Sequence, residues 1–531
     1  MTAAAGDADA VQTITRGYAF TGPALELGAL LVDGEPSPGA QIRVPLGMLN
    51  RHGLVAGATG TGKTKTLQLM AEQLSAHGVP VFMADIKGDL SGVSQPGQAS
   101  EKLTARAASI GQDWQATGYP VEFLALGGQG TGVPVRATIT SFGPTLLAKV
   151  LDLNETQSSS LALVFHFADK AGLALLDLKD LRAVIQYLIS DEGQADLQGL
   201  GGLSKATAGV ILRELIAFAD AGAEVFFGEP EFDTRHLLRT AGDGRGIITC
   251  LELPAVQDKP ALFSTFLLWM LADLFQDLPE AGDLDKPKLV FFFDEAHLLF
   301  KDASKAFLDQ ITQTVRLIRS KGIGVFFVTQ SPKDVDSDVL AQLGNRVQHA
   351  LRAYTPDDAK ALRAAASTFP KSSYDLEELL TQLGIGEAVI TVLSERGAPT
   401  PVAWTRLRAP QSLMAPASAE AMTAAVTASP LNADYAQAID RESAYERLAA
   451  KLAPSPSVES TLREEPARRP EPDPAAPQRA ERAPSRAPRE EPGIVEGVVK
   501  SSAFKSFLRS AGTVLGREIT RSIFGTARRR R

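Results

Sequence analysis

The sequence predicts an α/β protein with a mainly parallel central sheet, and three observations support this prediction. From residue 53 onward, segments typical of strands and of helices alternate, as in sheets that carry helices on both faces. A glycine-rich turn at residues 57–64 joins a short apolar strand to a helix. Continuous apolar runs at residues 289–293 and 325–328 are typical of central parallel strands, because both faces of such strands are buried.

Each element follows from its residue pattern. Strands are expected where short apolar runs end in turn residues, at residues 54–56, 79–84, 121–126, 246–253, 289–294, 325–329 and 347–351. A helix is expected at residues 63–76. Helical spacing without strand signals predicts an insertion with helices at residues 146–151, 155–171, 178–189 and 205–221. A hairpin at the edge of the sheet is expected from residues 387–393 and 401–407.

These elements divide the chain into seven segments. A flexible N-terminus (1–18) and a short β or loop segment (19–52) precede the α/β core, whose two parts (53–143 and 236–410) flank the helical insertion (144–235). Residues 411–492 are expected to be a linker with one candidate helix at 432–452. This segment is first rich in Ala, Ser and Thr, and then holds ten prolines among Arg and Glu. A basic amphipathic helix is expected at 493–531.

Composition excludes several classes of protein. The 531 residues exceed what one hydrophobic core needs, and 44% apolar with 22% charged residues is close to the globular average. The single cysteine, Cys250, excludes intramolecular disulfides and cysteine-based zinc sites, and we expect it to be a buried strand residue without chemistry. The six histidines are never three or four positions apart, which argues against a local histidine metal site.

The sequence has no pattern typical of a targeting or membrane segment. Asp7 and Asp9 lie where a secretory signal would be basic. The most apolar stretch, residues 261–275, is too short to span a bilayer and contains Asp273. We therefore expect a cytoplasmic protein without an integral membrane segment.

Charge is unevenly distributed along the chain. The net charge is −8, but residues 493–531 hold nine basic and two acidic residues, a net charge of +7, which leaves −15 for the rest. Apolar residues recur in this tail at three- and four-residue spacing, with the basic residues off that stripe. Three interpretations stay open: docking onto its own or a neighbouring subunit, contact with an anionic membrane, or contact with nucleic-acid phosphates.

The strongest chemical motif fits G-x-x-x-x-G-K-[ST] at every fixed position and consists of Gly57, Ala58, Thr59, Gly60, Thr61, Gly62, Lys63 and Thr64. Its glycines let backbone N–H groups turn inward around phosphate oxygens, and the helix N-terminus favours an anion. Lys63 is expected to reach the β- and γ-phosphates, and the Thr64 hydroxyl to bind Mg²⁺. With Lys65, these residues form the predicted binding site for ATP.

The second motif ends an apolar strand with two carboxylates, Asp294 and Glu295. Parallel sheets bind ligands at this end of their strands. Asp294 suits the coordination shell of Mg²⁺, and Glu295 suits polarisation of an attacking water. Because hydrolysis needs the second carboxylate and mere binding does not, Glu295 favours an ATPase over a passive nucleotide binder.

Other polar residues follow neighbouring strands. Gln330 is expected to contact the γ-phosphate and the water. Asp85 is expected either to support the magnesium site or to form hydrogen bonds at its strand end, and the alternative is a solvated loop charge. Hydrolysis at a subunit interface also needs a cation from the neighbouring subunit, and the candidates are Arg316, Arg319, Arg346 and Arg352, each of which is alternatively a surface arginine.

Taken together, these residues resemble the HerA/FtsK superfamily of P-loop motor ATPases. The resemblance is closest to the bacterial HerA-helicase-C-terminal-domain-like proteins of the YjgR type, and it covers residues 20–410 and the C-terminal helix. Its most specific features, in this order, are Asp-Ile-Lys-Gly-Asp at 85–89, Thr-Gln at 329–330 and Asn-Arg at 345–346.

The resemblance implies a RecA-like core, a ring assembly that is usually hexameric, and ATP hydrolysis at subunit interfaces. Arg346 is similar to the arginine that reaches the ATP site in FtsK-type motors, and Arg319 is the second choice. The region before residue 53 is short for the β-barrel of HerA helicases, and no DNA-reading module like that of FtsK is visible.

Two functions therefore stay open. The first is a ring-forming, Mg²⁺-dependent ATPase that acts on DNA as a helicase or translocase. The second is a nucleotide-switched scaffold whose ATP state controls a protein partner through the C-terminal helix. Turnover that DNA stimulates would favour the first, and slow turnover with ATP-dependent assembly would favour the second.

Overall fold

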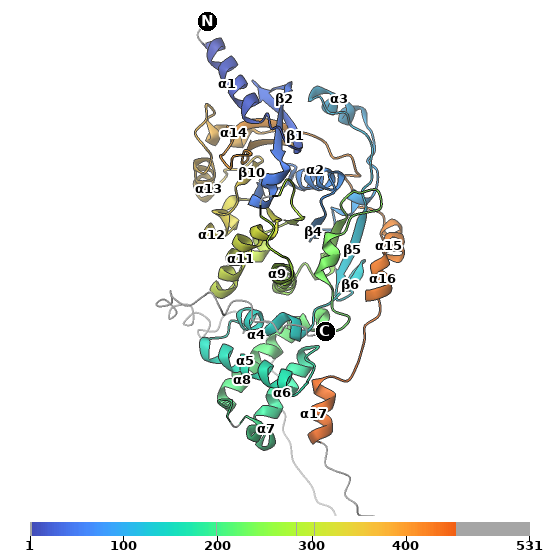
Figure 1. The fold of residues 1–531 in the computed structure, drawn as a ribbon. Coiled ribbons are helices and arrows are strands. Elements are labelled where there is room, and N and C mark those ends of the chain that lie inside the picture. Colours follow the sequence, from blue (N-terminus) through green and yellow to red (C-terminus); the bar gives the residue numbers. More distant parts are fainter. Residues whose placement is uncertain (1–2, 198, 283, 302, 453–531) are drawn as a thin grey trace, which may run out of the picture. The chain divides into compact units, whose positions relative to one another are not determined.

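The computed structural model describes residues 3–452, apart from residues 198, 283 and 302 (Figure 1). Strands and helices alternate through most of this part of the chain, so the predicted α/β class is confirmed. The Pro-rich part of the predicted linker and the predicted helix at 493–531 lie outside the described residues.

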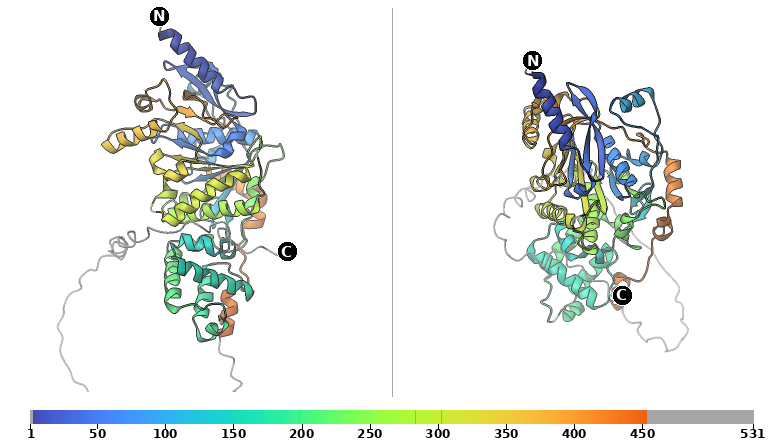
Figure 2. Two further views of the ribbon diagram at one scale, coloured as in Figure 1. Left: turned by 60° about the vertical axis from the view of Figure 1, so that its left-hand side comes forward. Right: turned by 45° about the horizontal axis from the view of Figure 1, so that its top comes forward.

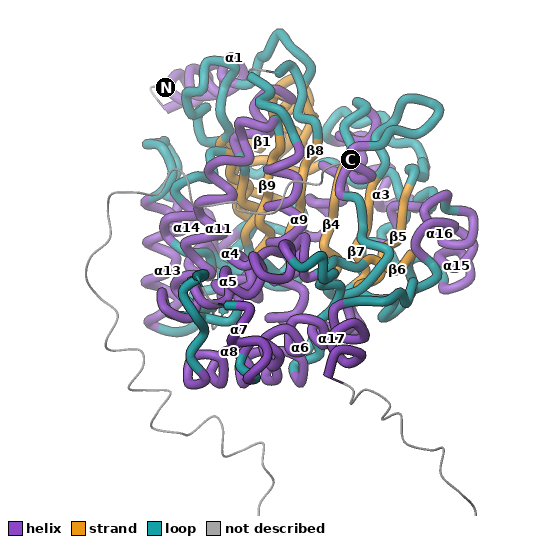
Figure 3. The backbone as a smooth tube through the Cα atoms, turned by 60° about the horizontal axis from the view of Figure 1, so that its bottom comes forward, coloured by secondary structure: helices purple, strands orange, loops and turns teal. Residues whose placement is uncertain are grey.

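A twelve-stranded sheet runs through the described residues in the order β2-β1-β12-β11-β10-β3-β9-β8-β4-β7-β5-β6 (Figure 1, Figure 3). The strands from β10 to the end of this order (β10-β3-β9-β8-β4-β7-β5-β6) are parallel to one another. The other four strands, β2, β1, β12 and β11, pair antiparallel with their neighbours. The sheet is thus mainly parallel, as predicted. Its strands are β1 (Ala24–Val32), β2 (Glu35–Pro45), β3 (Gly53–Ala56), β4 (Val81–Asp85), β5 (Val121–Leu126), β6 (Val133–Val135), β7 (Ile248–Glu252), β8 (Leu289–Phe293), β9 (Ile323–Thr329), β10 (Asn345–Gln348), β11 (Glu387–Thr391) and β12 (Ala403–Leu407).

Aromatic side chains of the parallel strands pack on both faces of the sheet. Because successive strand residues point to opposite faces, Phe291 and Phe293 belong to one hydrophobic cluster and Phe292 to the other. Phe291 packs against Phe82 with ring centroids 4.9 Å apart, and Phe292 packs against Phe326 at 5.3 Å. The continuous apolar runs of the sequence therefore form a core on each side of the sheet.

Helices cover both faces of the sheet (Figure 2, Figure 3). α2 packs into the cluster of Phe292, whereas α9 and α11 pack into the cluster of Phe291. The helices outside the insertion are α1 (Ala3–Gly17), α2 (Lys63–Ala76), α3 (Glu101–Ser109), α9 (Pro260–Asp277), α10 (His297–Phe300), α11 (Lys305–Ile318), α12 (Ser337–Leu340), α13 (Pro356–Ser367), α14 (Leu376–Gln382), α15 (Ala419–Ala428), α16 (Pro430–Tyr435) and α17 (Ala444–Leu452).

Within the described residues between β6 and β7, five α-helices form an all-helical insertion. They are α4 (Ile139–Val150), α5 (Glu155–Lys170), α6 (Leu178–Leu188), α7 (Asp191–Asp196) and α8 (Lys205–Asp220). Asn154 and Asp177 begin α5 and α6 with capping boxes, which satisfy the free N–H groups of each first turn. α4 contacts α9 and α11, so the insertion is joined to the helices under the sheet.

The end of the N-terminal segment is packed, although the sequence predicts a flexible segment at 1–18. α1 leads to Tyr18, which is fully buried and whose hydroxyl donates to the carbonyls of Ile390 and Pro401 at 3.0 and 2.8 Å. β1 and β2 then form a hairpin within the predicted β or loop segment. The partners of Tyr18 lie more than 370 positions away in the chain, so local composition cannot indicate this packing.

The hairpin expected from residues 387–393 and 401–407 forms as β11 and β12, but its predicted place at the edge of the sheet is wrong. β1 adds to β12 with Ala29 opposite Arg406, and β2 is the outer strand. The error arises because the strand that covers β12 comes from the other end of the sequence.

Residues 409–417, here named the strap, cross the outer face of α2 where the sequence predicts the start of a linker. Gln68 Nε2 donates to Ser412 Oγ at 2.6 Å and to the Leu413 carbonyl at 3.0 Å. The buried Glu72 carboxylate accepts from the N–H groups of Gln411 and Ser412 at 2.8 and 3.0 Å. Three helices, α15 to α17, follow the strap within the described residues.

None of the helices in residues 3–452 that the structure describes combines the length and the apolar character needed to cross a membrane. α9 contains the apolar stretch at 261–275, and it is buried against the sheet. Cys250 is a buried thiol in β7, as expected.

Candidate functional site

Residues 57–62 form a turn between β3 and α2, where the sequence predicts a phosphate-binding loop. Gly62 precedes α2 with φ of 111°, a left-handed conformation that glycine adopts without steric cost. A Cβ atom on Gly57 would lie 2.4 Å from the Cβ of His349, so the backbone can pass there only without a side chain. The turn leads into a helix N-terminus, whose free N–H groups favour an anion.

Lys63 contacts the backbone of this loop. Its Nζ donates to the Ala58 carbonyl at 3.1 Å, and the Thr61 hydroxyl donates to the same carbonyl at 2.7 Å. Burial lowers the pKa of Lys63, while the charges of Glu295 and Asp294 act in the opposite direction. These two carboxylates are therefore close enough to the loop to act on its lysine.

The other loop residues differ in exposure. Thr59 and Gly60 are exposed at the turn, whereas Thr64 is half-buried in the first turn of α2. Lys65 Nζ donates to Gln68 Oε1 at 3.2 Å, and burial lowers its pKa against the charge of Asp89. The Lys65 side chain thus lies toward the carboxylates that follow β4, and its role in nucleotide binding stays a prediction.

Asp294 directly follows β8 and is 3% exposed. Its Oδ1 accepts from the N–H of Glu295 at 2.9 Å, whereas its buried Oδ2 has no hydrogen-bond partner among the described residues. Burial, and next the charge of Glu295, raise the pKa of Asp294 to about 7. A buried carboxylate oxygen without a partner is what a cation ligand requires.

Three side chains lie close to the Glu295 carboxylate. Its Oε1 is ion-paired with Lys87 Nζ, and its Oε2 lies 3.5 Å from Gln330 Nε2 and 3.1 Å from His297 Nδ1. Burial raises the pKa of Glu295, but the hydrogen bond and charge of Lys87 outweigh it and bring the pKa below its usual value. The structure therefore brings together the two strand ends that carry Glu295 and Gln330.

Asp85 closes the turn that follows β4. Its carboxylate accepts from the N–H groups of Gly88, Asp89 and Leu90 at 2.7, 3.2 and 2.8 Å. Burial raises the pKa of Asp85 to about 6. Of the roles considered for Asp85, the structure shows hydrogen bonding at the strand end.

Glu252 is a buried carboxylate that the sequence analysis missed. It ends β7 opposite Asp85, and its Oε1 has no hydrogen-bond partner in the described part of the chain. Burial, and next the charge of Asp85, raise the pKa of Glu252 to about 9. The available signal was an acidic residue at the end of an apolar strand, the same pattern that identified Asp294.

The sequence analysis also missed His349 and Gly386, which contact the loop and the first turn of α2. His349 is fully buried, with Nε2 at 2.9 Å from the Thr66 hydroxyl, and burial followed by the charge of Lys63 lowers its pKa to about 4. The Gly386 N–H donates to the Thr61 carbonyl at 3.0 Å. These contacts join the loop to β10 and β11, and no local motif encodes them.

Arg346 and Arg319 lie away from the loop of their own chain. Arg346 pairs with Leu54, two residues before the end of β3, and its Nη1 donates to the Thr368 carbonyl at 3.3 Å. Arg319 follows α11 and precedes β9, which runs parallel to β3. It therefore lies at the edge of the sheet where these strands begin, opposite the loop.

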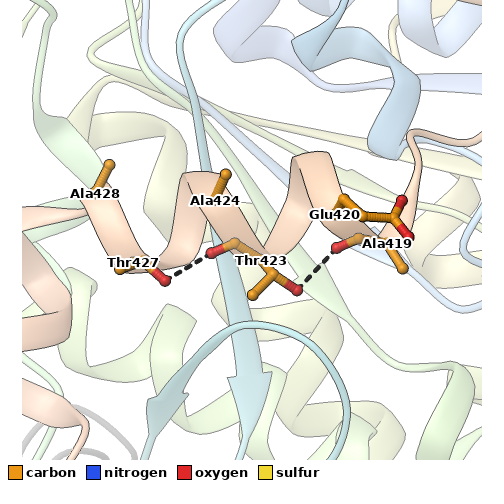
Figure 4. Close-up of a pocket in the computed structure, with 6 residues that line it drawn as sticks. All are labelled: Ala419, Glu420, Thr423, Ala424, Thr427 and Ala428. Carbon is orange, nitrogen blue, oxygen red and sulfur yellow. Dashed lines mark hydrogen bonds between the residues drawn. The ribbon is translucent and has the colours of Figure 1, made fainter.

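A shallow pocket elsewhere offers little chemistry for a ligand. It lies on α15 and is lined by Ala419, Glu420, Thr423, Ala424, Thr427 and Ala428 (Figure 4). The hydroxyls of Thr423 and Thr427 donate to carbonyls one helical turn earlier, at 2.8 and 2.9 Å. The motif residues lie outside this pocket.

The residues at the loop fit a magnesium ion that is bound together with phosphates. Among the described residues, no group of three or more His, Cys, Asp or Glu side chains could hold a metal ion. Mg²⁺ usually takes one or two protein ligands and completes its shell with phosphate oxygens and water. The half-buried Thr64 hydroxyl and the unpartnered Asp294 oxygen match that donor set.

The phosphate-binding loop, the paired carboxylates and the parallel sheet define a P-loop protein with a RecA-like fold. Comparison with known proteins identifies the type, because residues 31–531 match the family described as Helicase HerA-like C-terminal. The chain belongs to this family, as the resemblance predicted.

Two archaeal relatives carry the same name, DNA double-strand break repair helicase HerA. The protein from Saccharolobus solfataricus is 20% identical over 354 residues, which cover 66% of this chain and 63% of that protein. The protein from Sulfurisphaera tokodaii is 35% identical over 369 residues, which cover 66% and 64%. The chain therefore spans slightly less than two thirds of the length of these relatives.

The fold is also similar to that of solved structures of the coupling protein TrwB. The bacterial conjugative coupling protein TrwBdeltaN70 gives a TM-score of 0.50 with 16% identity, covering 76% of this chain and 93% of that chain. Plasmid coupling protein TrwB in complex with ADP and Mg²⁺ gives a TM-score of 0.50 with 17% identity, covering 76% and 92%. At this identity the likeness shows the fold alone.

Proposed function

We propose that this chain hydrolyses ATP. The observation that carries the proposal is that the loop with Lys63 after β3 and the carboxylates Asp294 and Glu295 after β8 follow parallel strands at one edge of the sheet, with Gln330 beside Glu295. The loop residues Gly57 to Thr64 and Lys65 bind the nucleotide. Thr64 and Asp294 hold Mg²⁺, which supplies positive charge to the phosphates when bound.

The proposed reaction uses one side chain for each task. Lys63 binds the β- and γ-phosphates, and Gln330 orients the attacking water. Glu295 takes a proton from that water as the water oxygen bonds to the γ-phosphorus. The bond from the γ-phosphorus to the oxygen bridging it to the β-phosphorus breaks, and ADP and phosphate leave.

We further propose a cytoplasmic ring, hexameric as the resemblance implies, that moves DNA. DNA is favoured because the two HerA relatives are named as DNA break repair helicases. Arg346 is proposed to act at the ATP site of the neighbouring subunit, with Arg319 as the second choice, because Arg346 donates to the Thr368 carbonyl and Arg319 follows α11 at the edge of the sheet opposite the loop. We also propose that a protein partner binds the helix that the sequence predicts at residues 493–531.

Two substitutions separate binding from chemistry, which is the first prediction. Lys63→Ala should weaken ATP binding and abolish turnover. Glu295→Gln should keep ATP binding and lose turnover, because the amide retains the shape but cannot take a proton. The measurements are nucleotide affinity and ATPase rate, each with and without single- and double-stranded DNA.

Parent-level turnover in Glu295→Gln would show that the assignment of the base is wrong. DNA-stimulated turnover in the parent protein supports a motor. Slow turnover that DNA does not change, with assembly that depends on ATP, would instead favour the nucleotide-switched scaffold.

A further inference from the structure

A lysine outside the phosphate-binding loop contacts the proposed base. Lys87 Nζ forms an ion pair and a hydrogen bond with Oε1 of Glu295. The Glu295 side chain is 5% exposed, whereas the Lys87 side chain is 47% exposed. The pair therefore joins a buried anion to a cation that enters from a solvent-accessible turn.

Hydrogen bonds connect the residues before and after Lys87 and so fix the turn that carries it. The Asp85 carboxylate accepts from the N–H groups of three residues that follow Lys87, and Gly88 has φ of 73°. Further along, the N–H of Ala417 in the strap donates to the Ser91 hydroxyl at 3.1 Å. Lys87 is thus presented to Glu295 from a backbone whose course is set by hydrogen bonds.

The carboxylate of Glu295 needs such a contact. Glu295 has φ of 47°, and its neighbour Asp294 is a second buried carboxylate. Removing the partner of a buried charge strongly destabilises the folded protein, and adjacent carboxylates repel each other. The Glu295 carboxylate therefore requires a cation nearby. Gln330 and His297 face only the other oxygen, Oε2, so neither replaces the cation at Oε1.

The two lysines of the site have separate contacts. Lys63 Nζ donates to the Ala58 carbonyl of the loop, at the position where phosphates are expected. Lys87 Nζ contacts the carboxylate that follows β8. Lys63 is therefore placed to bind the phosphates of the substrate, whereas Lys87 contacts the proposed base.

We propose that Lys87 is a positioning residue for ATP hydrolysis, which holds the Glu295 carboxylate in the direction of the attacking water and acts on the reaction only through Glu295. The inference rests on the proposed function, because it requires Glu295 to be the base. It adds a residue that the P-loop and the paired carboxylates do not include.

The test, which is the second prediction, is a double-mutant cycle in the full-length protein. Lys87→Met should lower kcat on the order of 10²-fold, as a misplaced catalytic group does, while KM and nucleotide affinity stay unchanged. Lys87→Arg should restore part of kcat, because it keeps a cation. The double variant Lys87→Met with Glu295→Gln should turn over no more slowly than Glu295→Gln alone, measured in single-turnover reactions with enzyme in excess.

Lys179→Met is the matched control. Lys179 is also 47% exposed and is ion-paired with Asp177 at 3.5 Å, but it lies in the helical insertion. It should keep the parent kcat. Unfolding midpoints of all variants in urea check that a loss of rate is not a loss of folded protein.

The outcomes distinguish this inference from the proposed function. If Lys87→Met slows Glu295→Gln by the same factor as it slows the parent, Lys87 acts independently of Glu295 and the inference is wrong, while ATP hydrolysis by Glu295 stands. Parent-level kcat in Lys87→Met also overturns the inference. Parent-level kcat in Glu295→Gln overturns the proposed function itself.

Discussion

Glu295 adopts a left-handed backbone conformation that is unusual for a residue with a side chain. Such positions cost on the order of 1–3 kcal/mol and persist where surrounding contacts hold them. Here the Glu295 N–H donates to Asp294 Oδ1, and the side chain is paired with Lys87. The two carboxylates at this turn have different surroundings. Asp294 Oδ2 has no hydrogen-bond partner among the described residues and can bind a cation, whereas Glu295 Oε2 faces Gln330.

His52 is a second residue with positive φ, at 59°, and it supports the start of β3. Its Nδ1 accepts from the N–H of Val325 at 3.0 Å, so this nitrogen carries no proton. Burial, and the charges of Arg319 and Arg51, lower the pKa of His52 to about 4. The folded protein thus holds a neutral histidine that the unfolded chain would protonate at mildly acidic pH.

The third prediction concerns the stability that depends on His52. Its folded pKa lies below its unfolded value of about 6.5, so its contribution is complete above pH 6.5 and falls as the pH drops toward 4. Between pH 7 and pH 5 the parent should lose on the order of 2 kcal/mol more stability than His52→Asn, whose side-chain oxygen keeps an acceptor. Urea unfolding at both pH values measures this difference.

Buried carboxylates with raised pKa values, such as Glu252, change stability in the opposite direction. They are present in both proteins and cancel in the comparison. Equal pH dependence of the parent and His52→Asn would contradict the assignment of a neutral, buried His52.

The strap is the element that joins α2 to the turn after β4. It contacts Gln68 and Glu72 on α2, and the Leu413 N–H donates to the Gln95 carbonyl at 2.9 Å. A Cβ atom on Gly92 would lie 2.0 Å from the Ala415 carbonyl oxygen, so the strap packs directly on the backbone there. The helix that begins with Lys63 and the turn that carries Lys87 therefore share one covering segment.

The fourth prediction tests the strap through Glu72. Glu72→Ala removes the acceptor of two backbone N–H groups and leaves them buried without partners. We expect a loss of about 3 kcal/mol in the free energy of unfolding, measured with urea. Glu214→Ala, on the exposed face of α8, is the control and should change stability by less than about 0.5 kcal/mol. A similar small change in Glu72→Ala would show that the strap does not hold α2.

Elements whose signals are local were predicted well. The helix predicted at 63–76 and the strand predicted at 121–126 have the bounds of α2 and β5, because a glycine-rich turn and an apolar run mark them. The position of β12 inside the sheet and the course of the strap were not predicted. Both depend on pairing with residues hundreds of positions away, which the period of the local sequence does not record.

In the candidate site, too, the contiguous motifs were predicted and the contacts between distant residues were not. The P-loop and the carboxylates after β8 were found because each is a contiguous motif with a known chemical task. The contact of Lys87 with Glu295 was not found, because it joins residues 208 positions apart. Glu252 and His349 were missed because their environment, rather than their neighbours in sequence, makes them unusual.

At the scale of the whole molecule, the direction of the parallel strands decides which residues can reach the nucleotide. β3, β8 and β9 all end at the edge that holds the loop and the carboxylates. Arg346 lies two residues before that edge and contacts Thr368, and Arg319 lies at the opposite edge. If one of these two arginines acts on the transition state, we therefore expect it to do so at the site of a neighbouring subunit in the proposed ring.

The fifth prediction tests whether Arg346 serves a neighbouring site. Arg346→Ala should lose on the order of 10³-fold in ATPase rate, as removal of an arginine finger does, with ATP binding largely intact. Mixing it with Glu295→Gln protein should restore part of the turnover, because some interfaces then combine an intact Glu295 with an intact Arg346. Native mass measurement must first show that the two variants assemble together. Co-assembled subunits without recovered turnover would mean that Arg346 acts within its own chain or only supports the fold, and the same mixing with Arg319→Ala would then test the second candidate.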